Sequence, residues 1–124
     1  VAAVGIPIRG TAPAYVLAVE AGPAHDVGVA IANPAPTEPA TVTLTLLNRE
    51  GTPVGDPVEL VLQGRNQIAR FVRTGEDALF AGIGPQIASR LVISSDQPIA
   101  VLGLRADFGG PFLISGIPVT PLEE

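Results

Sequence analysis

The most constraining feature of this sequence is a strict alternation of apolar and polar side chains over residues 40–47. The segment reads Ala-Thr-Val-Thr-Leu-Thr-Leu-Leu, so Val42, Leu44 and Leu46 fall on one face and three threonines fall on the other. Successive side chains of an extended chain point to opposite faces, and a period of two is typical of a strand with one buried face. The sequence therefore predicts an antiparallel strand here.

Other short apolar runs recur along the chain and are separated by turn-forming residues. Residues 58–62 resume the alternation after turn chemistry around Glu50 and Gly51, so we expect these two runs to form a hairpin. The other expected strands are residues 4–9, 15–19, 27–32, 67–72, 88–94, 99–105 and 112–119. About 7–9 strands at such spacing indicate an all-β fold, an antiparallel immunoglobulin-like β-sandwich.

Two connections have a specific expected structure. Ser95-Asp96-Gln97-Pro98 is a good turn tetrapeptide and should separate two strands. Residues 75–80 lack a period of two, and we expect one short helical turn there, with Leu79 and Phe80 packing inward.

The composition favours one domain that buries part of its surface against other copies. The chain has 124 residues, of which 15% are charged, against about 25% in ordinary soluble domains. Its mean hydropathy is +0.43. A membrane span is not expected, because Pro, Gly, Thr or a charge interrupts every apolar run well short of about 18 residues. Contact with further copies of the chain accounts for the excess of apolar residues.

Several classes of chemistry are excluded by the residues present. The chain has no cysteine and one histidine, which rules out disulfides, thiol nucleophiles and multi-histidine metal sites. The net charge is −5 and the seven arginines are scattered, so nucleic acid is not an expected partner. No cofactor, metal or membrane partner is expected.

Catalytic interpretations of the polar residues are weak. His25 and Asp26 are neighbours, but adjacent side chains in a turn rarely face each other, so a catalytic triad is not expected. The acids at Glu76, Asp77, Asp96 and Asp107 are interpreted as caps or turn formers, with a calcium site between two loops as the weaker alternative. We therefore expect no enzyme. Three of the five aromatic rings are expected in the core, which leaves Tyr15 and Phe108 as poor platforms for a sugar.

The two ends of the chain resemble each other. Gly5-Ile6-Pro7-Ile8 is echoed by Gly116-Ile117-Pro118-Val119, and proline confines both segments to edge or terminal strands. Residues 4–9 either pair within their own chain or complete the sheet of a neighbour by strand donation. On the second interpretation residues 1–14 are an N-terminal strand and linker, and residues 15–124 are the β-sandwich domain. The candidate self-assembly interface is Val4, Ile6, Pro7, Ile8, Ile117, Pro118 and Val119.

A family resemblance adds to this reading. The runs Val-Gly-Val-Ala-Ile-Ala-Asn-Pro at residues 27–34, Ala-Thr-Val-Thr-Leu-Thr-Leu at 40–46, Gln-Ile-Ala-Arg-Phe at 67–71 and the stretch 91–105 resemble a poorly characterised family of secreted bacterial β-sandwich modules. The resemblance covers residues 27–119, and such modules occur as tandem repeats in exported surface proteins. It implies an immunoglobulin-like sandwich with an extracellular, non-catalytic role and supplies no catalytic residues.

Two functional hypotheses follow. The first is a secreted structural protein whose copies associate head to tail, by N-terminal strand donation, into an extracellular filament or surface layer. The alternative is a monomeric adhesion or carbohydrate-binding module that binds surface glycans. The chain begins at Val1 rather than Met, which fits removal of a secretion signal or of an initiator Met.

Overall fold

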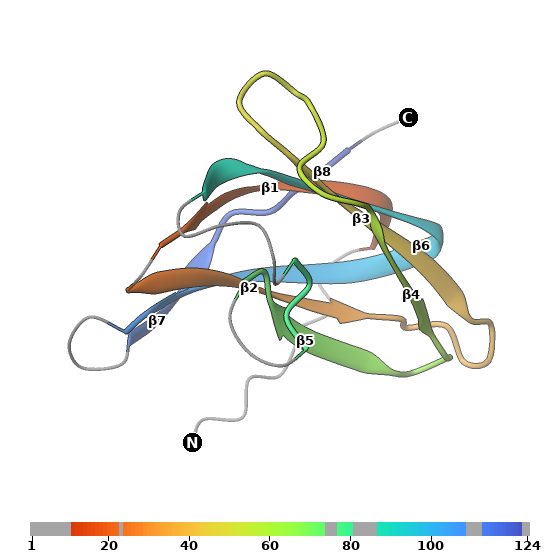
Figure 1. Cartoon of the computed structure of the whole chain (residues 1–124). Coiled ribbons are helices and arrows are strands. Elements are labelled where there is room, and N and C mark those ends of the chain that lie inside the picture. The colour runs from red at the N-terminus through yellow and green to blue at the C-terminus, as the bar shows by residue number, and fades with distance from the viewer. Residues whose placement is uncertain (1–10, 23, 74–76, 81–86, 109–112, 123–124) are drawn as a thin grey trace.

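The protein is all-β. The computed structural model describes residues 11–22, 24–73, 77–80, 87–108 and 113–122, and this part contains eight strands and no helix (Figure 1). The strands are β1 (Ala12–Ala21), β2 (His25–Ala32), β3 (Ala40–Leu47), β4 (Val58–Leu62), β5 (Gln67–Phe71), β6 (Ile87–Asp107), β7 (Leu113–Ile117) and β8 (Thr120–Pro121). The expected strand at residues 4–9 lies outside the described residues.

One long strand organises the topology. The first half of β6 pairs with β1 and β3, and its second half pairs with β2 and β7. The first ladder has the order β4-β3-β6-β1-β8, while β5 extends the second ladder on the far side of β2. Every pair is antiparallel. Figure 1 shows the two ladders as two layers, so a single continuous sheet folds over on itself along β6.

The prediction of a turn at residues 95–98 is wrong, because these residues lie inside β6. Ala12 pairs with Ile99 and Ala14 with Ser94, so β6 gains extra residues there relative to β1. The turn-forming side chains satisfy backbone groups at this irregularity: the Thr41 N–H donates to Asp96 Oδ1 at 2.8 Å, and the Gln97 N–H to Ser95 Oγ at 3.2 Å. The chain passes to the other layer here without reversing direction, as a bulged strand can.

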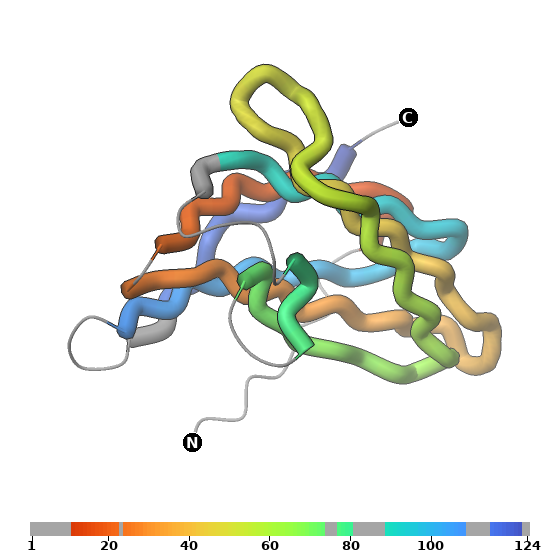
Figure 2. The backbone as a smooth tube through the Cα atoms, in the orientation of Figure 1, coloured from red at the N-terminus to blue at the C-terminus, as the bar shows by residue number. Residues whose placement is uncertain are grey.

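The hairpin of β3 and β4 is confirmed, with Val42 opposite Leu60 and Leu44 opposite Val58. The buried residues of β3 are Ala40, Val42, Leu44 and Leu46, as the alternation predicts. The connection between these strands projects from the molecule (Figure 2). It is held at its base by Asn48, whose Oδ1 accepts hydrogen bonds from the N–H groups of Glu50 and Thr52.

The helical turn expected at residues 75–80 is not confirmed. Residues 77–80 form turns, and residues 74–76 lie outside the described part of the chain. The N–H groups of Leu79 and Phe80 donate to the carbonyls of Phe71 and Val72 at 2.9 and 2.6 Å. Both side chains are buried as expected, so this segment closes one end of the core.

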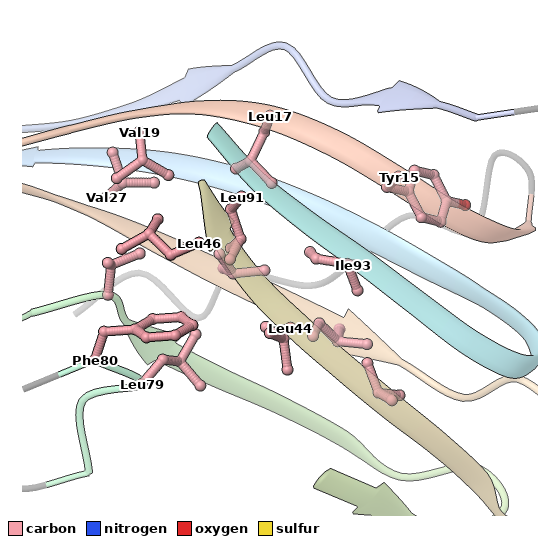
Figure 3. Close-up of a cluster of buried hydrophobic side chains, with 14 of the residues drawn as sticks. Tyr15, Leu17, Val19, Val27, Leu44, Leu46, Leu79, Phe80, Leu91 and Ile93 are labelled. Atoms are coloured by element: carbon pink, nitrogen blue, oxygen red, sulfur yellow. The ribbon is translucent and has the colours of Figure 1, made fainter. Parts of the chain in front are cut away.

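The core lies between the two layers (Figure 3). β1 contributes Tyr15, Leu17 and Val19, and Leu91 and Ile93 of β6 are fully buried beside them. Each buried aliphatic side chain of this size contributes roughly 1.5–3 kcal/mol relative to exposure. A core of this kind stabilises the fold in a chain that has no cysteine.

β1 begins at Ala12, before the boundary expected between a linker ending at residue 14 and a domain beginning at residue 15. Ala12 and Ala14 already pair with β6, so three of the residues expected in the linker, residues 12–14, belong to a strand.

Gly103 of β6 provides a test of packing between the layers. A Cβ atom at Gly103 would lie 2.7 Å from Ile117 Cγ1 and 3.1 Å from Leu17 Cδ1, whereas a Cβ at Gly116 would meet nothing within 4 Å. We expect Gly103→Ala to lower the free energy of unfolding by about 1–3 kcal/mol, because overpacking forces neighbours to shift. Urea denaturation measures this, with Gly116→Ala as the matched control that should cost nothing. Equal stability of the two variants would contradict the close approach at Gly103.

Candidate functional site

Within the described residues the first ladder ends in two edges: the outer side of β4, which has no partner strand, and the side of β1 away from β6, which is called the open edge below. β1 pairs with β6 along one side, but β8 pairs with the other side only at Tyr15 and Val16. Within the described part of the chain, no strand pairs with that side of β1 from residue 17 to residue 21. An unpaired strand edge is a template for another strand.

The direction of the backbone groups along this edge follows from β8. The Leu122 N–H donates to the Ala14 carbonyl at 2.9 Å, so Ala14 faces β8. In an antiparallel ladder the N–H and C=O of one residue point to the same side, and alternate residues share that side. Ala18 and Glu20 therefore present their N–H and C=O groups to the open edge.

An apolar cavity of about 490 Å³ lies along the same edge. Its lining residues come from both layers and are Val16, Leu17, Ala18, Glu20, Val27, Arg90, Arg105, Ile117, Pro118 and Thr120. The chain leaves β7, crosses from one layer to the other and ends as β8 beside β1 (Figure 1), and three residues of this path, Ile117, Pro118 and Thr120, line the cavity. Its volume falls within the range of protein binding pockets, about 300–1,000 Å³.

Part of the predicted self-assembly interface lies at this cavity. Ile117 is half-buried and Pro118 is exposed, and both line it. Val119 is half-buried and packs against the core beside them. The other four residues of the predicted interface, in the segment 4–8, lie outside the described residues.

Charged side chains gather at one end of the open edge. Glu20 Oε1 lies 3.5 Å from Arg105 Nη1 and 3.7 Å from His25 Nε2. Arg105 Nε also lies 3.3 Å from Asp107 Oδ1. The Glu20 side chain is 64% exposed, so its ion pair with Arg105 contributes at most about 1 kcal/mol. This end of the open edge therefore carries an exposed carboxylate, that of Glu20. Arg90 of β6 lies directly across from Ala18.

The polar residues weighed as catalytic or calcium-binding have structural partners. Asp26 is buried, and its carboxylate accepts hydrogen bonds from the N–H groups of Val27 and Arg73. Asp77 lies 3.9 Å from Arg70, and Asp96 and Asp107 have the partners given above. Glu76 lies outside the described residues. In the ranges described, no three His, Cys, Asp or Glu side chains gather as a metal site would require, and no helix is long and apolar enough to cross a membrane.

The expectation that Tyr15 is an available ring is wrong. Tyr15 is 5% exposed, and its hydroxyl donates to the Ile99 carbonyl at 2.7 Å. The burial of Tyr15 could have been predicted from the sequence, because Tyr15, Leu17 and Val19 alternate with outward-facing residues and share one face of β1. Phe108 is 38% exposed and packs edge-to-face on Phe71, with 6.1 Å between ring centroids.

Comparison with known proteins supports the fold. No protein-family model and no curated protein matches the sequence. The structure is similar to the crystal structure of Thermotoga maritima 1070, with a TM-score of 0.71 and 16% sequence identity. The match covers 91% of this chain and 96% of that chain. At this identity the likeness shows a shared fold alone.

Tyr15 gives a pH-dependent test of the anchor that holds the start of β1. Burial raises the pKa of Tyr15 above its ordinary value of 10.0, and a backbone hydrogen bond with Ala12 opposes this more weakly. The folded protein thus holds the phenol proton more tightly than the unfolded chain does. The stability from this group is complete below pH 10 and is lost as the pH rises through the folded-state pKa.

We expect Tyr15→Phe to lower the free energy of unfolding at neutral pH by about 1 kcal/mol, because a buried hydrogen bond is lost. The variant should also lose less stability than the parent above pH 10. Tyr15 is the single tyrosine of the chain, so tyrosinate absorbance reports it alone. Ionisation of the folded protein with the pKa of a free phenol would contradict this account.

Proposed function

We propose that this chain is a non-catalytic structural protein whose copies associate head to tail by N-terminal strand donation. The donated segment is residues 4–9, and the acceptor is the open edge of β1 with the cavity beside it. The observation that carries the proposal is that Ala18 and Glu20, which no described strand pairs with on this side, lie beside an apolar cavity that Ile117 and Pro118 help to line.

The chemistry of the two surfaces is complementary. Addition of a strand to a sheet edge gains affinity from main-chain hydrogen bonds and specificity from pockets for alternate side chains. Ile6 and Ile8 alternate with Gly5 and Pro7, so the segment carries large apolar groups on one face only. A head-to-tail contact of this kind uses different surfaces on the two copies, and it extends into a filament when the rotation between copies does not close a ring.

The wider setting of the proposal is an extracellular filament or surface layer built of immunoglobulin-like sandwiches. Its support is the sequence resemblance to secreted surface modules and the two facing layers of antiparallel strands. The non-catalytic role is supported by the described acids, because Asp26, Asp96 and Asp107 serve as hydrogen-bond or ion-pair partners within the fold.

Removal of residues 1–10 tests the donor. We expect the full chain to form assemblies of high mass and the shortened chain to lose them, because the acceptor edge would have no strand to bind. Light scattering on a sizing column measures the mass, and negative-stain electron microscopy shows the shape. A synthetic peptide of residues 1–10 should bind the shortened chain. Filaments formed without residues 1–10 would refute strand donation.

Substitution at Ala18 tests the acceptor. Ala18→Pro removes an N–H that points to the open edge, at a position where proline spares the ladder with β6. We expect at least a tenfold loss of self-association with folding retained, since one strand-pairing bond is lost and the proline ring obstructs approach. Ala18→Thr is the matched control, because it keeps the N–H and should assemble. If Ala18→Pro assembles as well as Ala18→Thr, this edge is not the acceptor.

A third outcome favours the other functional class. A full chain that stays monomeric and binds a glycan saturably would support the adhesion or carbohydrate-binding module, and the structural role would then be abandoned.

A further inference from the structure

We infer that the donated strand runs parallel to β1, with Ile6 beside Leu17, Ile8 beside Val19, and Arg9 of the donor copy beside Glu20 of the acceptor copy. This inference rests on the proposed function and specifies its interface. It follows from three constraints: the position of Pro7, the face that the isoleucines must occupy, and the charges along the edge.

The first constraint is the missing N–H of Pro7. The cavity is lined from both faces of the ladder, and its core side is formed by Leu17, Val27 and Ile117. Ile6 and Ile8 can point toward this core side only if they align with inward-facing residues of β1, so Pro7 aligns with Ala18 or Glu20. In an antiparallel ladder a residue opposite Ala18 or Glu20 must exchange both hydrogen bonds with it, because these residues face the open edge. Pro7 has no N–H to donate. Every such antiparallel register therefore lacks a bond.

A parallel ladder avoids this defect. In a parallel ladder a residue bonds to the two residues that flank the one opposite it. With Pro7 opposite Ala18, the Ala18 carbonyl would accept from the N–H of Ile8, and the Ala18 N–H would donate to the carbonyl of Ile6. Glu20 would bond in the same way to Gly10 and Ile8. Pro7 then lies where no donor toward β1 is needed. β8 follows the same rule on this edge: Pro121 lies opposite Tyr15, which faces away from β8, and Thr120 lies opposite Val16, which faces it.

The second constraint is the face of the sheet. Leu17 and Val19 are each 2% exposed and point into the core, whereas Ala18 and Glu20 are exposed. Neighbouring residues of a ladder place their side chains on the same face. Ile6 and Ile8 then point inward beside Leu17 and Val19, toward the Val27 and Ile117 side of the cavity. β8 already occupies Tyr15 and Val16, so the ladder begins at Ile6 and Val4 lies beyond it.

The third constraint is charge. Arg9 is the single charged residue of the donated segment, and Glu20 is the single charged residue of β1 along the open edge. Its carboxylate also lies 3.5 Å from Arg105 Nη1 of the same copy, so Arg9 would share it. The parallel register aligns Arg9 and Glu20 on the outer face. The antiparallel register that pairs Arg9 with Ala18 would instead place it about two strand spacings, roughly 10 Å, from Arg90, which lies across from Ala18. Opposite charges on neighbouring strands stabilise a ladder, so the pair of Arg9 and Glu20 favours the parallel register.

Charge reversal in the full chain tests this register. We expect Arg9→Glu alone and Glu20→Arg alone each to weaken self-association by about 5- to 10-fold, because each replaces the opposite pair by a like pair. The double variant should restore assembly. An equimolar mixture of the two single variants should also assemble, because each donor then meets an acceptor of opposite charge. Glu59→Arg is the matched control for net charge, since it is an exposed glutamate on β4.

The outcomes separate the register from the proposed function. If Arg9→Glu strengthens assembly, the segment runs antiparallel beside Arg90; if it leaves assembly unchanged, Arg9 lies away from both charges. Either result overturns the parallel register while strand donation stands. Loss of assembly in both single variants without recovery in the double variant also overturns it. A full parent chain that stays monomeric overturns the proposed function and the register together.

Discussion

The passage of β6 from one layer to the other is the constraint on which the rest of the structure depends. Its first half pairs with β1 and β3 and its second half with β2 and β7, so one strand holds both ladders in fixed relation. Polar side chains make this passage possible, because Asp96 and Ser95 accept backbone hydrogen bonds where the register is irregular. The Tyr15 hydroxyl secures the same region by donating to Ile99. The core between the layers and the close contact of Ile117 with Gly103 follow from this arrangement.

The open edge is a consequence of where the last strands go. β7 pairs with the second half of β6, and the chain must then cross between the layers to reach β1. Pro118 and Val119 form the crossing, and β8 is only two residues long. It therefore pairs with β1 only at Tyr15 and Val16. The cavity forms because the crossing segment passes beside Leu17 and Val27 without filling the space between the layers. Within the described residues, a short final strand thus leaves an unpaired edge and an apolar space together.

Local patterns in the sequence predict the strands well and their connections less well. The threonine alternation of β3 and the hairpin with β4 follow from side-chain period alone, since one face is buried and the other is not. The segment 95–98 has turn-forming residues, but its tertiary hydrogen bonds to β3 keep the strand continuous, and no local pattern shows this. The resemblance of their segment to the N-terminal one draws attention to Ile117 and Pro118, which line the cavity. No local pattern points to Arg90, Arg105 and Val27, because they reach the cavity from strands distant in sequence.

An exposed strand edge can pair with unwanted chains as well as with a correct partner. The charge of Glu20 bears on both kinds of pairing. Natural proteins protect edges with short strands and charged residues, which oppose pairing with arbitrary chains. Glu20 has this effect on β1, because most apolar strands would leave its carboxylate without a new partner. In the proposed assembly, a donor with Arg9 at the matching position would meet a complementary charge instead, so one residue would disfavour wrong strands and favour the right one. On this view the apolar contacts of Ile6 and Ile8 supply most of the affinity, and the exposed ion pair supplies the choice of partner and direction.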